Sequence, residues 1–174
     1  MRRVLSLLSS DGVSRDLLVQ AEQELGLHGG VWPAVKALVE ASLVTFGGDA
    51  RAGFSSGDRG VVAVHRLTAL VVCHEAGRPP GDDQVVALDT ATRLLEALID
   101  RFPLDQVSLR RDELDELTSH TEALRGHIED PSPQLLVQAD RIAGLQEEAG
   151  DLTRALPLFE RTLVDRERVL GAEH

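Results

Sequence analysis

The sequence IAGLQEEAGDLTRALPLF, residues 142–159, contains the residue spacing that decides the fold of this chain. Apolar and small residues recur at helical intervals on both sides of Gly150-Asp151, a pair typical of a tight turn between two helices. The pattern predicts one helix over about 134–149 and a second over 152–170. The carboxyl-terminal part of the chain is therefore expected to be a helical hairpin.

Four residues are expected to determine how this hairpin packs. Small side chains at Ala143 and Ala155 allow two antiparallel helices to approach closely, and Gly150 permits the turn. Phe159 is expected to fill the groove towards a neighbouring repeat. Together with Ile142, these intervals resemble those of the tetratricopeptide repeat. The alternative interpretation is an unrelated helical hairpin.

The stretch from Ala155 to His174 resembles the longer tetratricopeptide repeats of the kinesin-light-chain type. In those repeats Gly-x-x-His, here Gly171 to His174, is followed by proline and a new helix. The resemblance implies that further repeats follow in a longer parent protein. Those repeats would sense a protein or peptide ligand, which this sequence does not identify.

Two more helices are predicted upstream of the hairpin. Apolar residues at helical spacing indicate helices over about 82–102 and 107–127. The prolines within 130–133 cannot continue the second helix, so a hinge is expected there. The acidic run 112–116 is expected to be the solvated face of a helix.

The first 77 residues predict a mixture of helices and a β-hairpin. Ser14 is expected to cap a helix, and a glycine-rich loop to join two β-branched strands. On the helix over 32–41 the expected apolar residues are Val35, Leu38 and Val39, with Trp32 as a further candidate. In order, the elements are a short helix or turn at 4–8, helices over 14–25 and 32–41, strands over 43–46 and 61–64, and a helix over 65–76.

Two helices followed by a hairpin is an order similar to that of a winged helix. We therefore expect a mainly α chain in three parts. Residues 1–77 would form a winged-helix-like domain with a small β-hairpin, and residues 78–131 a linker and helical connector. Residues 132–174 would form the first hairpin of a tetratricopeptide-type array.

A histidine stands where the second strand ends and a helix is expected to begin, in VAVHRL, residues 62–67. This junction resembles the Met-His-Asp motif of NB-ARC and related STAND signalling ATPases, including bacterial members with tetratricopeptide arrays. The resemblance implies that His65 contacts the β-phosphate of ADP, and an imidazole can donate to phosphate oxygens. Val64 and Arg66 depart from the family's Met and Asp, so the contact made by that Asp is absent.

The chain has neither the phosphate loop G-x-x-x-x-G-K-S/T nor a G-x-S-x-G nucleophile motif. Its six histidines and single cysteine do not show metal-ligand spacing. We therefore expect no enzymatic activity, no catalytic residue, no metal and no cofactor in this chain. ATP or ADP would bind a domain upstream of it in the parent.

The resemblance implies a non-catalytic regulatory and protein-interaction fragment of a nucleotide-switched signalling protein. It would couple the upstream ATPase core to the downstream tetratricopeptide sensor array. Its partners would be that core, those repeats, and a protein or peptide ligand.

The alternative function is that of a winged-helix DNA-binding transcriptional regulator, with the helix over 32–41 in the major groove. Only one basic side chain, Lys36, is available on that helix. The formal charge of the chain is −11, of which residues 1–77 carry about −1 and residues 78–174 about −10. Such a surface repels the phosphate backbone, so we expect no nucleic-acid partner.

A cytoplasmic location without membrane contact is expected. The single cysteine, Cys73, excludes an internal disulfide and fits a reducing compartment. No apolar stretch approaches the roughly 20 residues that a membrane-spanning helix needs.

Overall fold

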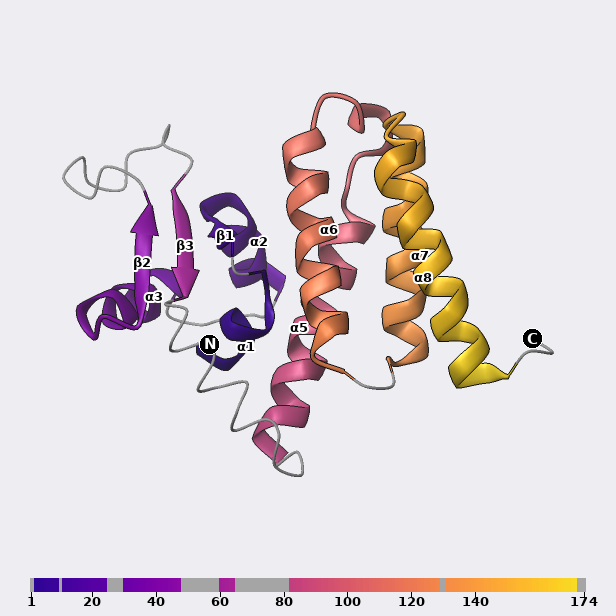
Figure 1. The fold of residues 1–174 in the computed structure, drawn as a ribbon. Coiled ribbons are helices and arrows are strands. Elements are labelled where there is room, and N and C mark those ends of the chain that lie inside the picture. Colours follow the sequence, from indigo (N-terminus) through magenta and orange to yellow (C-terminus); the bar gives the residue numbers. More distant parts are fainter. Residues whose placement is uncertain are drawn as a thin grey trace. The chain divides into compact units, whose positions relative to one another are not determined.

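The computed structural model describes residues 2–9, 11–24, 30–47, 60–64, 82–128 and 131–171. Over these ranges the chain is mainly α-helical, with seven α-helices and a small antiparallel sheet near the amino terminus (Figure 1). It divides into two compact units, Met1–Leu94 and Leu95–His174. The three-part division expected from the sequence stays a prediction.

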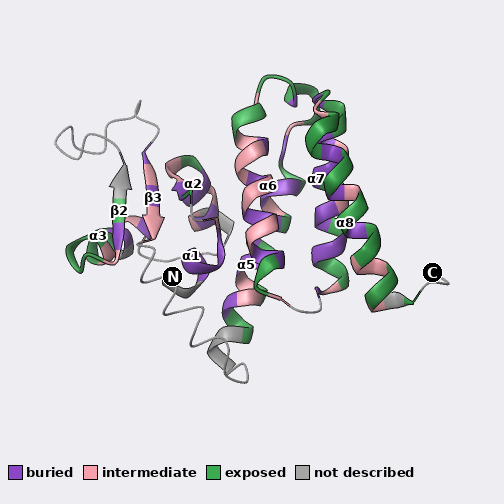
Figure 2. Cartoon of the chain, in the orientation of Figure 1, coloured by how far each residue is buried: buried purple, intermediate pink, exposed green. Residues whose placement is uncertain are grey.

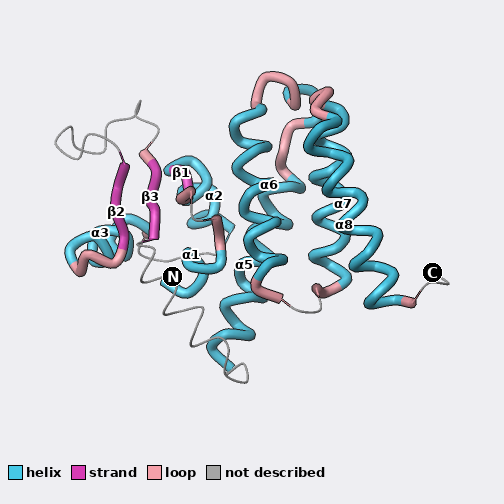
Figure 3. Tube along the Cα trace, in the orientation of Figure 1, coloured by secondary structure: helices cyan, strands magenta, loops and turns pink. Residues whose placement is uncertain are grey.

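The first unit combines short helices with a three-stranded sheet (Figure 3). Its elements are α1 (Arg2–Leu7), β1 (Val13–Ser14), α2 (Arg15–Glu24), α3 (Val31–Glu40), β2 (Val44–Gly47), β3 (Val61–Val64) and the first part of α5 (Asp82–Asp100). β3 lies between β1 and β2 and is antiparallel to both, with Val62 opposite Val13 and Phe46. The predicted hairpin is confirmed. β1 has no signature in the sequence, because two residues are too few to show a strand period.

Ser14 joins β1 to α2. Its Oγ accepts a hydrogen bond from the backbone N–H of Leu17 at 3.2 Å, which confirms the predicted cap. The next backbone N–H, that of Arg15, donates to the carbonyl of Gly60 at 2.8 Å. The start of α2 is therefore tied to the residue that precedes β3.

Aliphatic side chains from the helices and strands are buried in the first unit. They include Val4, Leu5, Val13, Leu17, Leu18, Ala21, Val31, Val35, Val44 and Val62. On α3 the buried residues Val31 and Val35 are one turn apart, and Leu38 is half-buried. The expectation that Val39 lies on this face is wrong, because it is exposed. Val39 lies about 40° round the helix from Val35, on the side away from Val31 and Leu38, so it stands at the edge of the buried face.

The second unit is built from antiparallel helices. It contains the end of α5, a 3₁₀ helix (Leu104–Gln106), α6 (Arg111–Gly126), α7 (Pro133–Glu148) and α8 (Leu152–Leu170). α7 packs against both α6 and α8, and successive helices run in opposite directions (Figure 1). The predicted helical hairpin is therefore confirmed. Buried positions recur along each of these helices (Figure 2). They include Leu114, Leu117, Leu124, Leu135, Leu136, Ala139, Ile142, Ala143, Ala155 and Leu158.

The helix predicted to begin near residue 107 begins instead at Arg111. Pro103 is extended and starts a 3₁₀ turn, and Arg110 has non-helical dihedral angles (φ −110°, ψ 37°). Val107 is buried in this connection, whereas Leu109 is 85% exposed. The apolar residues before Arg111 therefore made the predicted helix begin too early, although Val107 anchors the preceding turn.

The helix expected over 65–76 and the linker at 77–81 lie outside the described residues, as do residues 48–59 between the strands. Within the described ranges, none of the helices is both long and apolar enough to cross a membrane.

Gly12→Ala is expected to destabilise the first unit by about 2 kcal/mol or more. Gly12 has φ +99°, and an added Cβ would meet Val61 Cγ1 at 2.4 Å and the Val62 carbonyl oxygen at 3.1 Å. The matched control is Gly144→Ala in α7, where a Cβ meets nothing within 4 Å and should stabilise the helix by about 0.5–1 kcal/mol. Urea denaturation followed by circular dichroism measures both changes, and an unaltered midpoint for Gly12→Ala would contradict this account.

Candidate functional site

The turn between α7 and α8 is closed by backbone hydrogen bonds. Gly150 has φ +79°, its N–H donates to the Glu147 carbonyl at 2.9 Å, and the Asp151 N–H donates to the Gln146 carbonyl at 2.8 Å. This pair of bonds is the Schellman motif, which requires a residue in the left-handed region and therefore favours glycine. Asp151 then caps α8 by accepting from the Arg154 N–H at 3.2 Å.

The residues expected to control repeat packing lie on this hairpin. Ala143 and Ala155 are fully buried on α7 and α8, the two helices that pack together most closely in this unit. Gly150 is in the turn, and Phe159 is half-buried on α8. The structure thus brings the two alanines into the helix–helix packing that their size favours. Their role in stacking successive repeats stays a prediction.

Charged side chains connect α6 to α8, although these helices are not neighbours in sequence. Arg154 of α8 pairs with Asp115, and Arg161 pairs with Glu122 with its Nη1 3.2 Å from Oε1. The paired residues are 39 positions apart in both cases, which places α6 and α8 in a constant register. The acidic run 112–116 is therefore only partly a solvated face, because Asp115 is engaged by α8.

A third cross-link is buried. The side chain of Arg125 is 1% exposed, and its Nη2 lies 2.5 Å from Oδ2 of Asp165. Its Nη1 lies 3.4 Å from Oγ1 of Thr162, and that hydroxyl donates to the Leu158 carbonyl at 2.7 Å. A guanidinium withdrawn from water in this way needs its carboxylate partner, because desolvation of an unpaired charge costs several kcal/mol.

Two histidines, one within α6 and one directly after it, differ in environment. His120 is fully buried, with Nε2 3.4 Å from Oε1 of Glu116. Desolvation lowers the pKa of His127, at the end of the helix, so this imidazole is neutral at pH 7. No group of three side chains that could hold a metal ion occurs in the part of the chain that the structure describes.

The opposite side of α8 has an apolar surface. Leu152, Leu156 and Leu163 are 55%, 57% and 59% exposed, and Phe159 lies between them. Their spacing of four, three and four residues places them on one side of the helix. We call these four residues the outer stripe; Figure 2 shows how much of α8 is exposed. Of these four residues, only Phe159 was expected from the sequence to face a neighbouring repeat.

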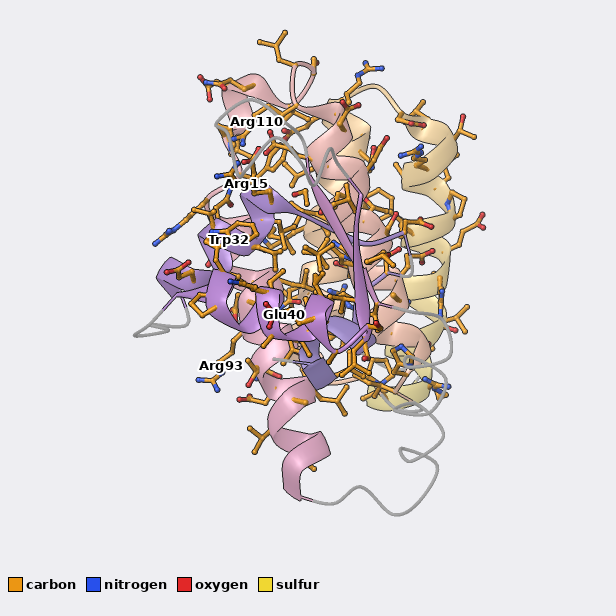
Figure 4. The ribbon with its side chains drawn as sticks, turned by 90° about the vertical axis from the view of Figure 1, so that its left-hand side faces the viewer. Arg15, Trp32, Glu40, Arg93 and Arg110 are labelled. Atoms are coloured by element: carbon orange, nitrogen blue, oxygen red, sulfur yellow. The ribbon has the colours of Figure 1, made fainter. Side chains whose placement is uncertain are left out.

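α3 offers little to a DNA duplex. Its single cation, Lys36, lies 3.9 Å from the carboxylate of Glu40, and both side chains are exposed. The exposed residues around them include the apolar Val39. At the start of the helix, Trp32 is covered by the guanidinium of Arg15, 5.5 Å from the ring centroid (Figure 4). The two charged residues of α3 itself, Lys36 and Glu40, sum to zero, so this helix has no net positive charge to attract phosphate groups.

His65, the residue expected to contact nucleotide, lies outside the described residues. The structure describes the strand that leads to it, β3, up to Val64.

No protein-family model matches this sequence, and no curated protein or solved structure matches it either.

Two features of the second unit were missed by sequence reasoning. The outer stripe had a signal, because apolar residues occupy more of the circumference of α8 than one packed face requires. The buried pair of Arg125 and Asp165 had none, because nothing in the residues of α6 distinguishes a buried arginine from a solvated one.

Asp165→Ala is expected to lower the free energy of unfolding by about 3 kcal/mol, because it leaves the Arg125 guanidinium buried beside only Thr162. The matched control, Asp100→Ala, removes the partner of Arg141 in a half-exposed pair and should cost about 1 kcal/mol or less. Urea denaturation compares the two. The double variant Arg125→Met/Asp165→Leu should recover part of the loss; equal costs for the two single variants would argue against a buried pair.

Proposed function

We propose that this chain is a non-catalytic module for protein interaction and regulation. In this proposal a winged-helix-like unit and a helical connector precede the first hairpin of a tetratricopeptide-type array. The observation that carries it is the α7–α8 hairpin, in which buried Ala143 and Ala155 permit close packing and Gly150 reverses the chain. The same hairpin leaves an apolar stripe exposed on α8, which is a surface of the kind that binds another protein.

The first unit supports the winged-helix part of the proposal through the order of its elements. Helix, strand, helix, helix and hairpin follow one another, and β1 pairs with β3 at one edge of the hairpin. This is the order in which a winged helix is built. It also places β3 immediately before His65, where the resemblance to STAND proteins requires a strand.

For regulation we propose the nucleotide switch of that family. In a parent protein with an ATPase core, the winged-helix-like unit would hold the ADP-bound state through His65, and the repeats would sense a ligand. Ligand binding would then separate packed surfaces as rigid bodies, which is a common way to switch between two states. Neither the ATPase core nor the ligand is part of this chain.

In a parent protein that contains the nucleotide-binding core, His65→Ala should increase the rate of ADP release by about tenfold, the effect of one lost hydrogen bond to a charged phosphate. Release of a fluorescent ADP analogue measures this rate. The matched control is His127→Ala, which removes an imidazole from the end of α6. Identical release from the parent and from His65→Ala would exclude the proposed contact.

The DNA-binding alternative makes a different prediction. We expect the full chain to bind a labelled DNA duplex no more tightly than about 10⁻⁴ M at physiological salt, because α3 lacks uncompensated positive charge. Lys36→Glu and the control Arg93→Glu, each of which removes an exposed cation paired within its own helix, should both leave fluorescence anisotropy unchanged. Salt-sensitive binding that only Lys36→Glu abolishes would favour a transcriptional regulator instead.

A further inference from the structure

α6 and α8 share part of their pattern of buried positions. α6 begins at Arg111 and α8 begins at Leu152, 41 positions later. With the same offset, buried positions coincide: Leu114 with Ala155, Leu117 with Leu158, and Thr121 with Thr162. The packed faces of the two helices are therefore equivalent at these positions, and the contacts of the neighbouring face of α6 can be compared with those of the same face of α8.

The outer stripe of α8 corresponds to a face of α6 that contacts the α7–α8 hairpin. The residues 41 positions before the stripe are Arg111, Asp115, Thr118 and Glu122. Each of them contacts the α7–α8 hairpin: Arg111 donates to the Ala149 carbonyl, Thr118 Oγ1 accepts from Gln146 Nε2 at 2.9 Å, and the two acids pair with Arg154 and Arg161. On α6 this face binds the α7–α8 hairpin through hydrogen bonds and ion pairs.

On α8 the same face is apolar and exposed. Leu152, Leu156 and Leu163 are each more than half exposed, and no charged group interrupts them along the helix side. Apolar side chains that remain in water over three turns of helix favour the burial of this face by another helix. The outer stripe is therefore a helix-docking face that depends on apolar burial.

The charged residues beside the outer stripe indicate which charge a helix that binds there should carry. Glu160 and Glu167 flank it, both are exposed, and neither has an ion-pair partner among the described residues. The arginines Arg154, Arg161 and Arg166 already pair with carboxylates of α6 and α7. The charge left uncompensated beside the stripe is therefore negative. A second copy of the chain, with formal charge −11, would bring the same acidic edge and be repelled.

We propose that the outer stripe of α8 binds an amphipathic helix of a partner protein whose apolar face is flanked by lysine or arginine. This inference names the partner chemistry of the proposed interaction module, and it rests on that proposed function. Apolar burial supplies the affinity, and Glu160 and Glu167 favour a basic partner over an acidic one.

The test uses the full chain and two synthetic helical peptides of about 20 residues, the length of α8. Both carry leucines at the spacing of the outer stripe; one has lysines beside them and the other has glutamates. Fluorescence anisotropy at low salt should show the lysine peptide binding about tenfold more tightly than the glutamate peptide. Glu160→Lys/Glu167→Lys should reverse this preference. Equal affinity for both peptides would overturn the proposal.

A second set of variants locates the binding face. Leu156→Glu/Leu163→Glu should abolish binding of the lysine peptide, whereas Leu109→Glu, at an 85% exposed leucine outside the stripe, should leave it unchanged. Circular dichroism checks that each variant folds. Binding that survives the double substitution would place the peptide elsewhere and refute the proposal. Sedimentation of the chain alone provides a further test, because a dimer lost on Leu156→Glu/Leu163→Glu would make a second copy the occupant and exclude the basic partner.

The two proposals fail separately. Loss of peptide binding with an intact effect of His65→Ala would remove this surface and leave the nucleotide switch. Normal peptide binding with no effect of His65→Ala would remove the switch and leave the surface.

Discussion

The left-handed conformation of Gly150 is the constraint on which the second unit depends. It lets the chain reverse within two residues, so that α8 returns along α7 with Ala155 and Ala143 both buried in the packed helices. The same reversal carries the cations of α8 to the carboxylates of α6 in a constant register. A longer or looser turn would change that register and separate these charges.

α8 packs against α7 and also makes ion pairs with α6, and its polar and apolar residues are distributed unusually between its faces. Its packed face contains Ala155, Leu158 and Thr162, and its arginines pair with carboxylates on α6 and α7. Three further leucines, Leu152, Leu156 and Leu163, are exposed to solvent. In an ordinary amphipathic helix leucines are buried and arginines are solvated. The departure means that the arginines of α8 are paired within the unit while its apolar surface remains available.

Much of the fold could be predicted from the sequence, because turn chemistry and helical periods are local. Ser14, Gly150 and the β-branched strands placed their elements correctly. The errors arose where tertiary contacts decide. Val39 continues an apolar pattern beyond the packed face of α3, and Val107 anchors a turn rather than a helix. The sequence of α8 shows more apolar residues than one packed face requires, but it does not show which apolar side packs on α7, so burial was needed to locate the outer stripe.

The withdrawal of Arg125 from water links parts of the chain that are far apart in sequence. Its carboxylate partner, Asp165, lies 40 residues later and near the end of the last helix. Until α8 has packed, α6 can bury its leucines only if the Arg125 guanidinium is buried without its carboxylate partner. Partly assembled forms of the second unit are therefore penalised, and its three long helices should form and dissolve in a single cooperative step. Proteolytic cleavage of α8 before Asp165 would therefore destabilise the remaining helices as well. They would lose the carboxylate that pairs with the buried Arg125 guanidinium.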